Sequence, residues 1–172
     1  MRIRPGGDQD LTVLQDIERA AGRGFRDFGM DAVADAEPPS LGMLRGYAEA
    51  AGLWVAVDAA VDMPLAFVLV EPVDGCTHIE QISVHPDNAG RRIGRALIEH
   101  VAARAAAGRV PALTLATFTE VPWNAPYYER CGFRRLAPDE LTPGLRKIRA
   151  EEALAGLDHW PRVCMRRDLG AG

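Results

Sequence analysis

The stretch QISVHPDNAGRRIGRALIEHV, residues 81–101, decides the fold of this chain. It alternates polar and apolar residues up to Pro86, as a β-strand does, and from Ile93 its apolar residues recur once per helical turn. Gly90 and Gly94 lie between the two halves, with arginines beside them. Such a turn can bind an anion, because the first amides of a helix have no partner within the helix. A solvated basic helix start is the alternative, since short glycine patterns are weak signals.

The composition is that of an ordinary water-soluble protein. The chain has 172 residues, of which 48% are hydrophobic and 26% charged, and its formal net charge is −4. This length is enough to bury a core, so residues 1–172 are predicted to form one domain. The acidic balance argues against a nucleic-acid partner, and no apolar run is long enough to span a membrane. Cys76, Cys131 and Cys164 match neither a disulfide framework nor a zinc pattern, so a reducing, cytoplasmic location without a metal is expected.

The periodicity of the remaining sequence predicts a mixed α/β domain. Strands are expected at residues 1–4, 53–58, 64–73, 76–86, 111–118, 132–136 and 162–169. Helices are expected at residues 8–24, 41–52, from the opening stretch to about 108, and at 121–131 and 139–160, with 25–40 irregular. Ser40 is expected to cap the second helix. The last strand leaves a homodimer open.

Two motifs in this order resemble the GNAT superfamily of N-acetyltransferases. ISVHPDNAGRRIGRALI, residues 82–98, is similar to the family's strand, V-x-P-like turn and Gln/Arg-x-x-Gly-x-Gly/Ala helix start. YYERCGF, residues 127–133, is similar to its later Tyr-Glu-Lys-x-Gly-Phe motif. The family's order of elements covers almost the whole chain. The resemblance implies an α/β (α+β) fold with a mostly antiparallel central sheet, a splayed strand pair and helices on both faces.

The resemblance also implies a site for acetyl-CoA. Backbone groups of the strand would pair with the pantetheine arm, at Ile82, Ser83 and Val84. Amides of the turn would take the pyrophosphate, over Ala89, Gly90, Arg91, Arg92, Ile93, Gly94 and Arg95. Ala89 and Arg92 depart from the motif, which prefers Gln or Arg and Gly at these places. Arg92 is expected to take up ordinary helical geometry.

Two residues near the later motif are assigned by the same resemblance. Tyr128 aligns with the tyrosine that protonates the departing CoA thiolate, a role that suits a phenol because it keeps its proton at neutral pH. A half-buried structural tyrosine is the alternative. Asn124 lies nearly one turn after the place of the family's asparagine, where this chain has Val121, and is the weaker candidate for a CoA contact.

A general base is needed because the attacking amine must be neutral. His78 stands where many relatives have a glutamate, and Glu80 follows on the same face of the strand. Histidine titrates near neutrality, and a buried Glu80 with a raised pKa would also serve. A structural role is the alternative for each, so the choice of base stays open.

The acceptor site is expected in the variable segments. Aromatic and acidic side chains there could bind an amine, and the candidates are Phe25, Phe28, Glu120 and Trp123. Core packing and ordinary solvent exposure are the alternatives.

These inferences predict an acyl-CoA-dependent N-acyltransferase, in which a small-molecule or peptide amine attacks acetyl-CoA directly in a ternary complex. A longer acyl donor is left open. The first alternative is a CoA-binding sensor or interaction domain without turnover. An acyltransferase for protein or aminoacyl-tRNA amines is another, although the acidic balance disfavours a tRNA substrate. A nucleotide P-loop is disfavoured because Gly-Lys-Ser/Thr is absent.

Overall fold

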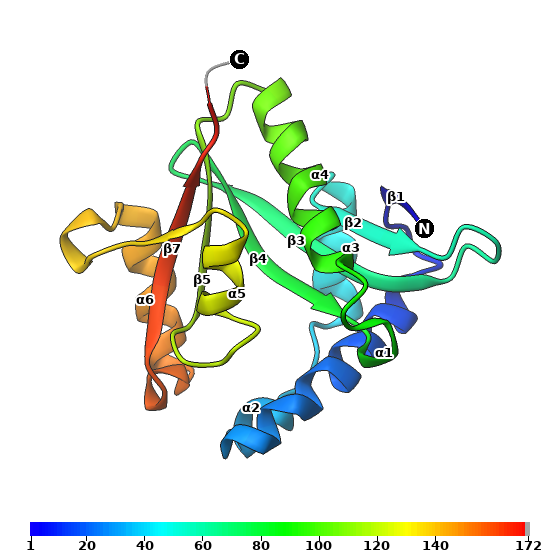
Figure 1. Ribbon diagram of the computed structural model, residues 1–172, viewed down its shortest axis with the longest axis horizontal. Helices are drawn as coiled ribbons and strands as arrows, with labels where there is room; N and C mark the ends of the chain where they lie inside the picture. Colours follow the sequence, from blue (N-terminus) through cyan, green and yellow to red (C-terminus); the bar gives the residue numbers. More distant parts are fainter. Residues whose placement is uncertain (171–172) are drawn as a thin grey trace. The chain divides into compact units, whose positions relative to one another are not determined.

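The computed structural model describes residues 1–170 of the chain. Its elements form a mixed α/β fold with a seven-stranded, mostly antiparallel open sheet flanked by helices, in the strand order β1-β2-β3-β4-β5-β7-β6 (Figure 1). The strands are β1 (Arg2–Pro5), β2 (Leu53–Val57), β3 (Pro64–Val73), β4 (Cys76–Val84), β5 (Ala112–Phe118), β6 (Arg134–Arg135) and β7 (Arg162–Asp168). The longer helices are α1 (Leu11–Gly22), α3 (Leu41–Glu49), α4 (Ile93–Ala107), α5 (Ala125–Arg130) and α6 (Pro143–Leu154). The fold class predicted from the sequence is therefore confirmed.

The prediction for residues 25–40 is wrong in part. A 3-10 helix, Arg23–Phe28, and a short helix α2, Asp31–Ala34, occupy much of this segment. Gly29, with φ of 68°, ends the 3-10 helix in the left-handed conformation that glycine adopts most easily. No apolar periodicity marks turns this short, so the sequence pattern could not separate them from a loop.

The described chain divides into two compact units. One contains Met1–Val70 and Gln81–His100, and the other contains Glu71–Glu80 and the chain from Val101. Strands β3 and β4 and helix α4 pass from one unit into the other. The prediction of a single domain stays a prediction.

The first unit is built on the antiparallel strands β1, β2 and β3. Helix α1 places apolar residues at helical spacing, and these pack with α3 and the strands in one cluster that includes Leu14, Leu44 and Phe67. Helix α3 begins as the sequence predicts, since the Ser40 hydroxyl accepts a hydrogen bond from the Met43 amide at 3.1 Å.

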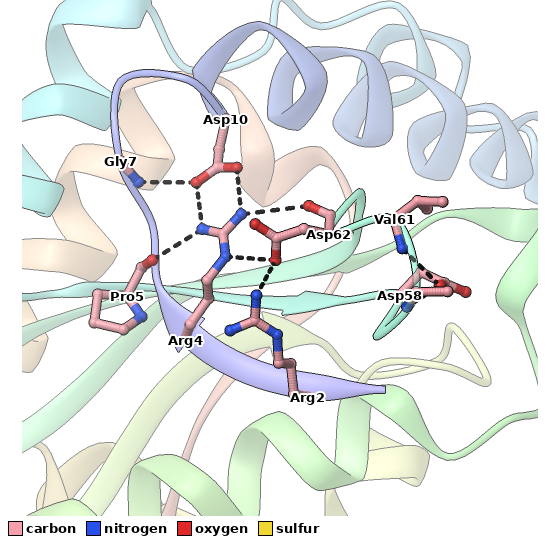
Figure 2. A network of polar contacts seen from close by, with 9 residues as sticks. Arg2, Arg4, Pro5, Gly7, Asp10, Asp58, Val61 and Asp62 are labelled. Carbon is pink, nitrogen blue, oxygen red and sulfur yellow. Dashed lines mark hydrogen bonds and ion pairs between the residues drawn. The ribbon is translucent and has the colours of Figure 1, made fainter.

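A polar network fixes the start of the first unit (Figure 2). The Arg4 guanidinium donates to both carboxylate oxygens of Asp10, at 2.7 and 2.9 Å, and to Asp62 in the turn between β2 and β3 at 3.0 Å. Asp10 is only 2% exposed and also accepts from the Gly7 amide. These hydrogen bonds raise the pKa of Arg4, so its charge is permanent. The network joins β1, the start of α1 and the β2–β3 hairpin.

The second unit contains the parallel pairing of β4 with β5, in which His78 lies opposite Thr114. Strand β5 also pairs antiparallel with β7, and β7 pairs with β6 at Met165 and Arg166. Since β7 has a partner strand on each side there, a dimer through the last strand, which the sequence leaves open, gains no support from an unpaired edge at these residues.

Helix α6 packs along β7 (Figure 1), where Leu145 contacts Leu136 and Cys164. Asp74, in the turn between β3 and β4, accepts a hydrogen bond from the Gly144 amide at the start of this helix, at 2.8 Å. The nearby Thr142 side chain, as the largest cause, and this amide lower the pKa of Asp74. The start of helix α6 is thereby attached to the β3–β4 turn, and the helix then packs on the sheet through Leu145.

The three cysteines are unpaired and buried, as core-packing residues are expected to be. Cys164 has its pKa raised to about 11 by burial and by nearby Glu152, against the opposing effect of two arginines.

Candidate active site

The turn before α4 has an unusual backbone. After the 3-10 helix Pro86–Asn88, Gly90 has φ of 77° and Arg92 has φ of 59°, and α4 begins at Ile93. The expectation that Arg92 takes up ordinary helical geometry is therefore wrong. Arg92 adopts the left-handed conformation of the glycine it replaces, at a cost of about 1–2 kcal/mol for a residue with a Cβ. The backbone thus keeps the path of a glycine turn without the second glycine.

The charges of this turn point into solvent. Arg91, Arg92 and Arg95 are exposed, and Arg91 donates to the side chain of Asn88 at 2.6 Å. Within residues 1–170, neither Arg92 nor Arg95 forms an ion pair. Ala89 and Gly90 are exposed too, and a Cβ on Gly90 would meet no atom within 4 Å. Arg92 and Arg95 therefore have no carboxylate partner within residues 1–170, whereas Arg91 interacts electrostatically with Asp58.

Strand β4 leads into this turn through Ile82, Ser83 and Val84. Ser83 is 7% exposed, and its hydroxyl donates to the carboxylate of Glu18 on α1. Glu18 on α1 therefore fixes the Ser83 side chain. The sequence pattern could not predict this contact, because the two residues are far apart in the chain.

Helix α5 carries Tyr128 in the second unit. Tyr128 is 7% exposed and lies edge-on to Phe133, with ring centroids 5.9 Å apart. Burial raises its pKa above the ordinary value, so the phenol is protonated at neutral pH. Asn124 precedes this helix, and its buried Oδ1 has no hydrogen-bond partner within residues 1–170. A buried acceptor without a donor is costly, and a ligand N–H or O–H would satisfy it.

His78 and Glu80 lie on the same face of β4, with His78 Nε2 3.8 Å from Glu80 Oε2. His78 is 1% exposed, and its Nδ1 lies 2.9 Å from the hydroxyl of Thr114. Burial lowers the pKa of His78 to about 4, so the expectation that it titrates near neutrality is wrong.

Glu80 titrates close to neutral pH. Its side chain is 43% exposed, and its pKa is raised to about 7, first by desolvation and then by repulsion from Glu71, Glu152 and Glu151. Arg162 acts in the opposite direction. The raised pKa predicted for Glu80 thus has a visible cause, although the side chain is less buried than expected.

Arg162, at the start of β7, is a residue that the sequence did not single out. Its side chain is 9% exposed, its Nε donates to Glu152, and its guanidinium lies 4.4 Å from the centre of the Phe118 ring. The only feature that could have pointed to Arg162 is its charge, since it lies at the start of a strand whose residues 164 and 165 are buried.

The residues suggested for the acceptor site belong to both units. Phe28 is 45% exposed and lies in the 3-10 helix of the first unit, where Phe25 is half-buried. Trp123 is 39% exposed, and Glu120 is exposed, both between β5 and α5. A role of these residues in acceptor binding stays a prediction.

The comparison with protein families decides the classification. The model of the acetyltransferase (GNAT) domain matches residues 49–135, half of the chain. This chain belongs to the GNAT family of acetyltransferases. The match spans both the turn before α4 and the Tyr128 motif on which the resemblance rested.

Solved structures share the GNAT fold with this chain. A GNAT acetyltransferase from Staphylococcus aureus Mu50 has a TM-score of 0.73 at 15% identity, and the match covers 98% of this chain and 99% of that chain. The PaiA N-acetyltransferase of Thermoplasma acidophilum, solved with coenzyme A, has a TM-score of 0.69 at 12% identity over 97% and 98%. N-acetylglutamate synthase of Neisseria gonorrhoeae, solved with coenzyme A and N-acetyl-glutamate, has a TM-score of 0.71 at 13% identity over 98% of this chain and 35% of that one.

Residues 1–170 contain neither a candidate metal cluster nor a membrane-spanning helix. Within residues 1–170, no group of three or more His, Cys, Asp or Glu side chains could hold a metal ion. In the same range, every helix is too short or too polar to cross a bilayer.

Proposed function

We propose that this GNAT protein is an acyl-CoA-dependent N-acyltransferase that moves an acetyl group from acetyl-CoA to a primary amine. The observation that carries the proposal is the protonation state of two groups in the second unit. Glu80 titrates at about pH 7 and can accept a proton, whereas Tyr128 keeps its proton and can donate it. Transfer from a thioester to an amine is assisted by one group of each kind.

The residues present suit coenzyme A as the donor. The unpaired Arg92 and Arg95, with the amides at residues 90–95, suit the pyrophosphate, and the unpartnered Oδ1 of Asn124 suits a donor on the ligand. The backbone of Ile82, Ser83 and Val84 is assigned to the pantetheine arm through the family resemblance alone. Acetyl-CoA would supply the thioester, and the proposal involves no metal.

The proposed reaction is a direct transfer in a ternary complex. Glu80 takes a proton from the acceptor ammonium, and the nitrogen lone pair attacks the thioester carbonyl. The C–N bond forms, the C–S bond breaks, and the thiolate takes a proton from Tyr128. The second surplus proton on the nitrogen leaves to solvent, and the Tyr128 phenolate regains a proton from solvent. Glu80 is the proposed base because His78, with a pKa of about 4, is a weak one. His78 then acts as a buried neighbour that holds its place through Thr114.

Thermal unfolding and a turnover assay test this function together. Acetyl-CoA at about 100 times its dissociation constant should stabilise the protein by about 2.7 kcal/mol, and adenosine should not. CoA release with a panel of amines should then be lower in Tyr128→Phe than in the wild type, while acetyl-CoA affinity stays similar.

The outcomes separate the alternatives. No thermal shift with acetyl-CoA would reject the cofactor. A shift without turnover of any amine would support the CoA-binding sensor, the alternative that the departures at Ala89 and Arg92 favour.

A further inference from the structure

The Arg162 guanidinium is fixed in place but retains two unused donors. Its Nε is bound to Glu152, and its plane lies over the Phe118 ring. Within residues 1–170, neither Nη1 nor Nη2 donates a hydrogen bond. These two donors keep some contact with solvent although the side chain is only 9% exposed, so a ligand can reach them.

Glu152 also binds a second arginine. Arg149 donates to Glu152 at 3.1 Å and to Asp158 at 2.6 Å, which ties the end of α6 to the segment before β7. Glu152 thus orients Arg162 through Nε, and the Nη1 and Nη2 donors of Arg162 stay available for a ligand. A guanidinium held in this way is suited to binding a planar carboxylate with two parallel hydrogen bonds.

Arg162 lies on the same face of the sheet as Glu80. Phe118 is directly opposite Arg162, and Phe118 shares its strand face with Thr114, which lies opposite His78. Since Glu80 follows His78 on that face, the base and the guanidinium project from the same side of the sheet. Arg162 is also near enough to lower the pKa of Glu80.

The surrounding charges favour a ligand with both signs. Glu71, Glu80 and Glu151 would attract an ammonium group, whereas the unused donors of Arg162 would repel it. A polyamine would leave Arg162 unsatisfied, and a phosphate dianion would be repelled by the three acids. A small molecule with a carboxylate beside its amine satisfies both ends.

We propose that the acceptor is a free amino acid, whose carboxylate is bound by Nη1 and Nη2 of Arg162 while its amine lies at Glu80. This inference rests on the proposed acetyl transfer and specifies its substrate class. The same arrangement would reject the amine of a peptide, which carries an amide where the free acid carries a carboxylate.

The wild-type protein allows a first test. With acetyl-CoA as donor, the twenty common amino acids are compared with their α-amides and with the amines that lack the carboxyl group. At least one free acid should exceed its own amide by about 100-fold in kcat/KM, as expected for two charge-assisted hydrogen bonds. Equal values for acid and amide would overturn the inference while leaving the acetyl transfer intact.

A matched pair of variants provides the second test. Arg162→Gln should erase the preference for the acid over the amide, chiefly through KM, and Arg162→Lys should restore only part of it because lysine lacks the planar fork. Arg166→Gln is the control, because Arg166 lies on the same face of β7 but binds Asp168. If Arg162→Gln lowers acid and amide equally, the residue is structural and the inference fails.

The remaining outcomes are also decisive. If acetyl-CoA binds and only amines without a carboxylate are acetylated, the inference is rejected and the proposed function stands. If acetyl-CoA does not bind, the proposed function is rejected. Should Arg162→Gln fail to fold, the comparison of acid with amide in the wild type still decides.

Discussion

At the scale of single residues, Arg92 shows how a motif can lose a glycine without losing its shape. The backbone at Arg92 keeps a φ of 59°, and the residues around it, not its own preference, impose that value. The side chain adds an unpaired charge where a glycine would add none. The left-handed conformation of Arg92 lowers the stability of the fold, and its side chain places a positive charge at the proposed anion site.

We expect Arg92→Gly to raise the free energy of unfolding by about 1 kcal/mol, since glycine adopts this conformation without the Cβ clash. It should also weaken acetyl-CoA binding by removing a cation. Urea unfolding and calorimetric titration measure the two effects. Arg95→Gln is the control, because it removes a charge from α4 without relieving a left-handed residue; a less stable Arg92→Gly would contradict the account.

Glu80 leads to a prediction about pH. A base must be deprotonated to accept a proton, so kcat/KM should fall about tenfold per pH unit below the pKa of about 7 and level off above it. Glu80→Gln should lose this fall of kcat/KM at low pH and most of the activity. His78→Gln should keep the fall of kcat/KM below pH 7, because the pKa of His78 is about 4. The reverse pattern would make His78 the base.

At the scale of elements, α6 links the β3–β4 turn to the far part of the same unit. Asp74 binds its first turn, Leu145 packs on the sheet, and Glu152 orients Arg162 near its last turn. A helix attached at both ends can hold a side chain in a defined position on the sheet. The position of Arg162 therefore depends on contacts more than ten residues away in the chain.

The start of α6 tolerates no added methyl group. A Cβ on Gly144 would lie 2.6 Å from Val73 Cγ1 and 2.7 Å from Asp74 Oδ2. Gly144→Ala should therefore lower the free energy of unfolding by about 1–3 kcal/mol, as overpacking does, and raise KM for the acceptor. Gly46→Ala, where the Cβ meets nothing within 4 Å inside α3, should instead be stabilising by about 1 kcal/mol. Similar effects of both changes in unfolding experiments would refute the steric argument.

At the scale of the molecule, the sequence predicted nearly every strand and long helix, because their periodicities are local. The Ser40 cap and the hairpin of β2 and β3 were predicted for the same reason. The left-handed Arg92 and the position of Arg162 could not be predicted, since both depend on tertiary contacts. The pairings of β4 with β5 and of β5 with β7 together reveal that Arg162 shares a face with Glu80. The roles of the predicted site residues remain predictions.

The Arg4 network makes a prediction for the whole fold. Asp10→Asn leaves a largely buried guanidinium without its main partner and should lower the free energy of unfolding by about 3 kcal/mol. Asp62→Asn should have a smaller effect, because Asp62 is 48% exposed. Circular dichroism in urea measures both, and equal losses would show that burial is not what gives the Asp10 pair its strength.

The burial of Cys76, Cys131 and Cys164 has a practical consequence for any assay of this protein. Their relative exposures are 7%, 4% and 2%, so a thiol-reactive dye reaches them slowly while the fold is intact. Coenzyme A released by turnover would colour such a dye at once, over a low background. The same dye, added during heating without substrate, would report the moment at which the core opens.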